Sequence, residues 1–119
     1  MYGVYVLGGG TAVFGTEDGN GPTITSHFAA IGTNNTTAPA TIIVNGGNYT
    51  AEAAPSDSDW WSYFCAPIYA AAAGDYQING GTFNGYYGIS DRYANVEQSV
   101  KLGEISINAS SEIDVFVDE

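Results

Sequence analysis

A short strand-like unit recurs four times along the chain and limits what the chain can fold into. Each copy starts with a polar residue, carries apolar residues at its second and fourth positions, and closes with Asn or Gly. Because side chains alternate between the two faces of a β-strand, the apolar pair of each copy is expected to point inward. The copies are 11–15, 41–45, 75–79 and 104–108, with inward pairs Ala12/Phe14, Ile42/Val44, Tyr76/Ile78 and Ile105/Ile107.

The spacing of these copies favours strands that stack from one winding of the chain to the next. The closing residues Gly15, Asn45, Asn79 and Asn108 lie 30, 34 and 29 positions apart. In a stacked coil, Asn45, Asn79 and Asn108 would lie about 4.8 Å apart and form a ladder of hydrogen-bonded amides. An array of antiparallel hairpins joined by Asn-Gly turns is the alternative, but it does not explain the shared phase.

The sequence therefore predicts an all-β fold, a short parallel β-helix (β-solenoid) of about four coils with lateral loop insertions. Right-handed winding is expected, because crossovers between parallel strands are right-handed in nearly all proteins. We expect one domain over 1–119, with coils at 3–27, 28–63, 64–85 and 86–110 and a terminal strand at 111–119. Glycine and proline interrupt the chain too often for an amphipathic helix.

Charge and composition exclude several classes of protein. The chain carries 13 acidic residues against 2 basic ones, a net charge of −11, so a nucleic-acid backbone would repel it. It contains no apolar run long enough for a membrane span, and we expect no membrane contact.

Cysteine and histidine each occur only once. Cys65, the single cysteine, is expected to be a buried free thiol. His27 is the single histidine, so one chain cannot build a His-rich metal site. The first residues also lack the pattern of a secretory signal.

Several stretches also resemble a known class of repeats. Residues 2–11 (YGVYVLGGGT), 30–34 (AIGTN), 78–83 (INGGTF) and 87–90 (YGIS) are similar to motifs of glycine- and threonine-rich parallel β-helix proteins. Such proteins occur on bacterial cell surfaces and in phage virions, and the resemblance covers most of residues 2–110. It implies a structural or adhesive role, and no catalytic residue carries over from it.

Two loops and the last strand supply the candidate contact residues. Adjacent tryptophans in loop 51–63 cannot both point inward from one strand, so they cover a coil face, contact another protein or stack on a sugar. The segment 112–119 alternates as a final strand and leaves one aromatic ring on its acidic side, where it needs a partner. The candidate partner or glycan contacts are Trp60, Trp61, Tyr63, Arg92, Tyr93 and Phe116.

Metal binding and catalysis are the weaker interpretations. Asp57 and Asp59 could offer oxygen ligands to Ca²⁺, but the rest of the calcium-loop pattern is missing, so a solvated acidic loop is favoured. Arg92 and Lys101 are the only basic residues, and nothing in the sequence sets their distance from nearby acids such as Glu97. We therefore expect no catalytic residue, no metal and no cofactor, with a polysaccharide-active enzyme as the third hypothesis.

The resulting hypothesis is a non-catalytic structural or adhesive β-helix that docks on a larger assembly. The first choice is a phage virion component, such as a capsid decoration protein, a head fibre or a tail part, made in the host cytoplasm. The alternative is a module of a bacterial cell-surface adhesin, which would lie outside the cell. Expected partners are other protein chains, either copies of itself, for example in a trimer, or capsid and tail subunits, together with surface glycans.

Overall fold

Short strands make up the regular structure of this protein. The computed structural model describes residues 3–7, 9–33, 38–53, 65–70, 72–90, 98–109 and 116–117, and these contain thirteen β-strands and no helix. The strands are β1 (Val4–Val6), β2 (Thr11–Phe14), β3 (Thr23–Ser26), β4 (Ile31–Thr33), β5 (Ala40–Val44), β6 (Asn48–Ala51), β7 (Ile68–Tyr69), β8 (Gly74–Ile78), β9 (Thr82–Gly85), β10 (Ile89–Ser90), β11 (Gln98–Leu102), β12 (Ser106–Ala109) and β13 (Phe116–Val117).

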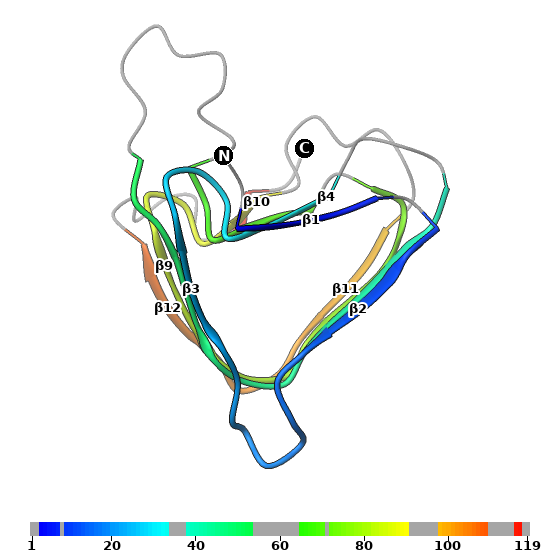
Figure 1. The fold of residues 1–119 in the computed structure, drawn as a ribbon, viewed down its shortest axis with the longest axis horizontal. Helices are drawn as coiled ribbons and strands as arrows, with labels where there is room; N and C mark the ends of the chain where they lie inside the picture. The colour runs from blue at the N-terminus through cyan, green and yellow to red at the C-terminus, as the bar shows by residue number, and fades with distance from the viewer. Residues whose placement is uncertain are drawn as a thin grey trace, which may run out of the picture.

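The strands form three parallel sheets. Sheet A has the order β1-β4-β7-β10-β13, sheet B the order β2-β5-β8-β11, and sheet C the order β3-β6-β9-β12. Each winding contributes one strand to each sheet, and the three sheets enclose a triangular interior (Figure 1). Every strand pair among the described residues is parallel, which confirms the short β-helix and excludes the hairpin array.

Successive windings differ in length but keep one register. In sheet A, Val4 pairs with Ile31, Ile31 with Ile68, Ile68 with Ile89, and Ile89 with Phe116. Four windings are complete, and β13 begins a fifth on sheet A. Seen from the end that carries β1, β2 and β3, the chain turns clockwise as it recedes, so the solenoid is right-handed (Figure 1).

The prediction for the fourth repeat copy was wrong. Residues 104–108 do not stack on 75–79; instead β11 pairs with β8, and Leu102 lies opposite Ile78. The stretch 99–103 (SVKLG) carries the same pattern of polar and apolar residues and closes with Gly103. Each winding must also place a strand in sheet C before it returns to sheet A. That strand is β12, so 104–108 cannot belong to sheet B.

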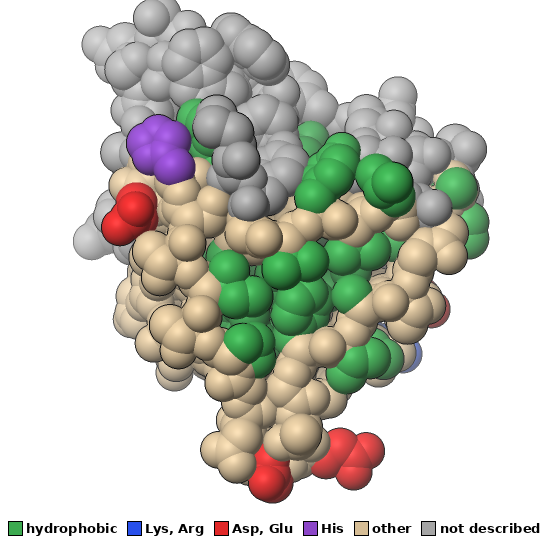
Figure 2. Space-filling view, in the orientation of Figure 1, with side chains coloured by type: hydrophobic (Ala, Val, Ile, Leu, Met, Phe, Trp, Pro, Cys, Tyr) green, Lys and Arg blue, Asp and Glu red, His purple; other side chains and the backbone are tan. Residues whose placement is uncertain are grey.

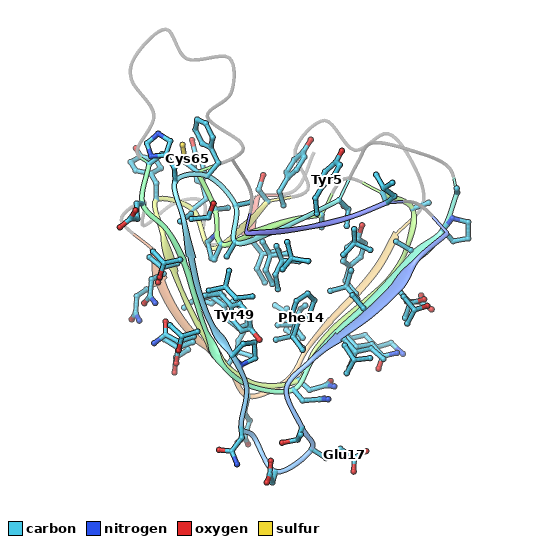
Figure 3. All side chains as sticks on the ribbon, in the orientation of Figure 1. Tyr5, Phe14, Glu17, Tyr49 and Cys65 are labelled. Carbon is cyan, nitrogen blue, oxygen red and sulfur yellow. The ribbon has the colours of Figure 1, made fainter. Side chains whose placement is uncertain are left out.

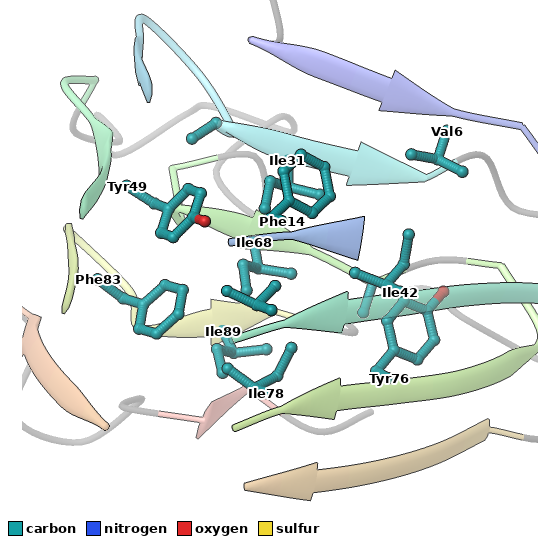
Figure 4. Packing of buried hydrophobic residues seen from close by; sticks show 13 residues of the cluster. Val6, Phe14, Ile31, Ile42, Tyr49, Ile68, Tyr76, Ile78, Phe83 and Ile89 are labelled. Carbon is teal, nitrogen blue, oxygen red and sulfur yellow. The ribbon is translucent and has the colours of Figure 1, made fainter. Parts of the chain in front are cut away.

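Side chains that point into the triangle form the main core (Figure 4). Tyr49 and Phe83, neighbours in sheet C, stack with ring centroids 5.2 Å apart and planes 11° from parallel. Phe14 meets Tyr49 edge-on at 6.2 Å. The predicted inward positions Phe14, Ile42, Val44, Tyr76 and Ile78 are buried, while Ala12, Ile105 and Ile107 are partly buried against this core.

Buried hydroxyl groups in this core have hydrogen-bond partners. The hydroxyl of Tyr49 donates to the carbonyl oxygen of Gly46 at 2.6 Å, and burial raises the pKa of Tyr49 to about 12. The hydroxyl of Tyr76 donates to the carbonyl oxygen of Ala72 at 2.6 Å, and the backbone N–H of Ala72 donates to Thr33 Oγ1 at 3.0 Å. These bonds let polar atoms lie inside the solenoid without the cost of an unpaired buried group.

A second, smaller core lies outside the triangle, where sheet C passes into sheet A (Figure 3). It contains Phe28, Cys65, Ala66 and Tyr87. Cys65 is buried as a free cysteine, as predicted. His27 lies next to this cluster, with its ring 4.8 Å from that of Phe28.

The corners between sheets B and C depend on glycine. Three residues, Asn-Gly-Gly, separate β5 from β6 and again separate β8 from β9, and Gly47 and Gly81 both have a φ of +115°. Glycine reaches this left-handed region without a steric penalty, whereas most residues do not. In the first winding the corresponding corner, 15–22, is longer and projects from the vertex of the triangle (Figure 1).

Acidic side chains lie at the tip of that longer corner, near Glu17 (Figure 3). The Thr16 hydroxyl and the backbone N–H of Asn20 both donate to Oδ1 of Asp18, the latter at 3.3 Å. The Thr16 hydroxyl bond is the main cause that lowers the pKa of Asp18 below its ordinary value. A backbone bond from Thr16 N–H to the Asn20 carbonyl closes the turn at 2.8 Å.

Candidate functional site

Two amide ladders run across the windings, where the sequence predicted one. In the first, Asn79 Nδ2 donates to Asn45 Oδ1 at 2.9 Å, and Asn45 Nδ2 donates to the carbonyl oxygen of Gly15 at 3.4 Å. Gly15 thus takes part through its backbone, although it has no side chain. The prediction that Asn108 continues this ladder was wrong, because Gly103 follows Asn79 in that column.

The second ladder lies on the outer face of sheet C and includes Asn108. Asn108 Nδ2 donates to Asn84 Oδ1 at 2.8 Å. Asn84 Nδ2 donates in turn to Asn48 Oδ1 at 2.9 Å and to Thr50 Oγ1 at 3.1 Å. Sequence reasoning missed this ladder, although the polar-apolar-polar triplets 48–50, 82–84 and 106–108 carry its signal.

The outer face of sheet C is uncharged. Its outward positions form two columns: Thr23, Asn48, Thr82 and Ser106, beside Thr25, Thr50, Asn84 and Asn108. All eight side chains are hydroxyls or amides, on a chain whose net charge is −11. Neighbouring strands of a sheet lie about 4.8 Å apart, so these groups repeat at that interval across the windings.

A groove of about 280 Å³ opens where the sheet C strands end. Tyr86, Glu52 and Asn108 offer polar groups to it from three successive windings. The other described lining residues are Thr50, Ala51, Ala53, Asn84 and Gly85. Tyr86 is half-buried, whereas Glu52 and Asn108 are exposed, so the groove is an open surface feature.

The end of the solenoid that carries the first winding is a second candidate surface. Within the described residues, β1, β2 and β3 each pair with one neighbouring strand, so their other edges carry unpaired backbone groups. Apolar side chains are visible inside the triangular rim at this end (Figure 2). Val4, Ala12 and Ile24 are only partly buried there.

Most of the predicted contact residues lie outside the described part of the chain. This holds for Trp60, Trp61, Tyr63, Arg92 and Tyr93, and also for the acidic pair Asp57 and Asp59. Phe116 lies in β13, where its backbone pairs with Ile89 in sheet A. Their proposed contacts therefore stay predictions.

The remaining candidates for chemistry do not form a cluster. Lys101 lies opposite Gln77 in sheet B, and Glu104 lies at the corner that follows β11. In the described ranges, no group of three His, Cys, Asp or Glu residues could hold a metal ion. A membrane-spanning helix is likewise absent from the described residues.

No protein-family model, curated protein or solved structure matches this chain. The resemblance to surface and virion β-helix repeats therefore stays a prediction from the sequence.

Proposed function

We propose that this protein is a non-catalytic structural β-helix that docks on a larger assembly through its open first winding. The first assignment is a phage virion component, such as a capsid decoration protein, a head fibre or a tail part. The alternative is a module of a bacterial surface adhesin, which the uncharged outer face of sheet C also suits. Both assignments use the solenoid as a rigid body and place its contacts on its surfaces.

The open end is the observation that carries this proposal. Free strand edges next to apolar side chains form a template on which another chain can add strands, and proteins usually protect such edges. Among the described residues, the first winding has no added helix or loop across its interior, where Val4, Ala12 and Ile24 remain partly exposed. A partner bound here would form backbone hydrogen bonds with the free edges of β1, β2 and β3 and would cover the apolar rim.

A charged substitution at this end tests the docking surface. Ile24 and Thr23 are neighbours in β3, but Ile24 packs against the core while Thr23 points outward. We expect Ile24→Lys to abolish assembly by placing a charge in the contact, and Thr23→Lys to weaken assembly much less, because its side chain points away from the apolar rim. Sedimentation velocity would measure the mass of each protein, and a melting curve would show that Ile24→Lys still folds. Assembly that survives Ile24→Lys in the folded protein would contradict docking through this end.

Co-sedimentation separates the two assignments. A virion component should sediment with purified phage particles and appear in their mass spectrum, whereas an adhesin module should remain with the bacterial envelope. A protein that stays monomeric at about 100 μM and joins neither fraction would have no docking role, because weak specific contacts form at such concentrations.

A further inference from the structure

The groove at the end of sheet C carries an inference separate from docking through the open end. Three windings build it: Glu52 follows β6, Tyr86 follows β9, and Asn108 lies in β12. Its volume of about 280 Å³ is close to the lower limit of small-molecule sites. The site thus has room for a small ring system.

The walls of this groove are held in place before any ligand arrives. Asn84 makes three side-chain hydrogen bonds, to Asn48, Thr50 and Asn108, which set the orientation of its amide. The ring of Tyr86 lies edge-on to that of Tyr87, with centroids 4.8 Å apart, and Tyr87 is buried in the second core. A binding site with fixed walls loses less conformational entropy when it takes up a ligand.

Polar groups that have no partner among the described residues belong to residues that line the groove. Asn108 donates one N–H to Asn84, which leaves its second N–H and its Oδ1 without a partner among the described residues. The Glu52 carboxylate likewise has no hydrogen bond or ion pair within the described part of the chain. Together these groups can donate one hydrogen bond and accept several, which is the pattern that adjacent hydroxyl groups require.

The lining also has an apolar component. Tyr86, which also packs against the second core, lines the groove together with the small residues Ala51, Ala53 and Gly85. A Cβ at Gly85 would lie 2.8 Å from Pro67 Cδ, so the close packing behind the groove requires glycine. An aromatic ring with hydrogen-bonding groups at its edge suits a ligand that has an apolar face and a polar rim.

The charge of the lining residues limits which ligands of that shape can bind. The described lining residues include one carboxylate and no basic residue, so an anionic ligand would meet repulsion from Glu52 without compensation from these residues. Glu52 is the one carboxylate in the described lining, and no group of three His, Cys, Asp or Glu residues in the described ranges could hold a metal ion. We propose that this groove binds a neutral saccharide, with one sugar ring against Tyr86 and its hydroxyl groups bonded to Glu52 and Asn108.

A printed array of matched neutral and anionic glycans provides the test, with the intact protein as the probe. We expect the wild-type protein to bind neutral glycans and to ignore their sialylated or sulfated counterparts. Glu52→Gln removes the charged acceptor with little change of shape, and Asn108→Ala removes the free amide. Each should lower the array signal about fivefold, and Tyr86→Ala should lower it about tenfold or more, since a tenfold change corresponds to one lost interaction of ordinary strength.

Matched controls separate the groove from general changes of charge or stability. Glu104→Gln makes the same charge change at the other end of β12, and Gln77→Ala alters the outer face of sheet B. Both should bind glycans as the wild type does. Glu52→Gln and Asn108→Ala lie at exposed positions and provide the test even if Tyr86→Ala fails to fold.

Three outcomes would overturn the proposal: no neutral glycan bound by the wild type, a preference for anionic glycans, or equal binding by the groove variants and their controls. None of these results bears on docking through the first winding, because Ile24 and Thr23 lie outside the groove lining. Equally, a chain that never assembles could still bind sugar here.

Discussion

Single asparagines stabilise this solenoid according to the number of partners they reach. The Asn84 side chain lies between two windings and bonds to residues in both, whereas the Asn108 side chain has one hydrogen bond among the described residues, to Asn84. Such bonds are partly exposed, so each contributes only about 0.5–1.5 kcal/mol net. The ladders therefore add to the stability of stacked windings that are already held by backbone pairing and core packing.

This difference gives a prediction at the residue scale. Asn84→Ala should lower the free energy of unfolding by about 1.5–3 kcal/mol, and Asn108→Ala by about 0.5–1 kcal/mol, because three bonds are lost in the first case and one in the second. Urea unfolding followed by circular dichroism would measure both. Gln77→Ala, on the outer face of sheet B, is the control and should change stability by less than about 0.5 kcal/mol. An Asn84→Ala protein as stable as this control would show that the ladder contributes nothing.

At the scale of elements, the corners between sheets B and C are limited by close backbone packing. A Cβ added at Gly46 would lie 2.1 Å from the carbonyl oxygen of Gly19, and one at Gly80 would lie 2.5 Å from that of Asn45. The corner of one winding thus rests directly on the backbone of the winding before it. Glycine is needed here for space as well as for the positive φ of Gly47 and Gly81.

The two requirements can be separated by experiment. At Gly46 there is no space for a Cβ atom. Gly19 has a φ of +93°, but no atom lies within 4 Å of the position that its Cβ would take. We expect Gly46→Ala to cost more than about 3 kcal/mol, because backbone must move, and Gly19→Ala to cost about 1–2 kcal/mol from local strain alone. Thermal and urea unfolding would give both values. A Gly46→Ala cost no larger than that of Gly19→Ala would contradict the conclusion that close contact between windings limits this corner.

At the scale of the whole molecule, the net charge of −11 opposes compaction. Thirteen acidic residues with two basic ones repel each other in the folded state more than in the expanded unfolded chain. Salt screens such repulsion, since the Debye length falls from about 30 Å at 0.01 M to about 10 Å at 0.1 M. Ionic strength should therefore have a strong effect on stability.

We expect the melting temperature to rise by about 4 °C or more between 10 and 300 mM NaCl, on the order of 1 kcal/mol for a domain of this size. A triple variant, Glu17→Gln, Glu52→Gln and Glu104→Gln, reduces the net charge from −11 to −8 at exposed positions. Repulsion scales roughly with the square of the charge, so the salt response should fall to about half. Calorimetry at the two salt concentrations would measure it, and a melting temperature that is independent of salt would contradict this account.

Local signals in the sequence determined the β-helix class of this protein. The alternation in 41–45 and 75–79 sets which side chains enter the core, and Asn-Gly-Gly after each copy sets a sharp corner, since both depend on neighbouring residues alone. The same signals predicted the stacking of Asn45 on Asn79, and the apolar stretch around Cys65 predicted the burial of that residue.

Contacts between windings, and not local sequence, set which strand stacks on which in the fourth winding. The stretches 99–103 and 104–108 carry the same pattern of polar and apolar residues, so alternation cannot assign them to different sheets. Pairing between windings assigns them, because each winding must supply one strand to every sheet. The same non-local pairing moves Asn108 beside Asn84 and brings Glu52, Tyr86 and Asn108 together at one groove, although they are far apart in the chain.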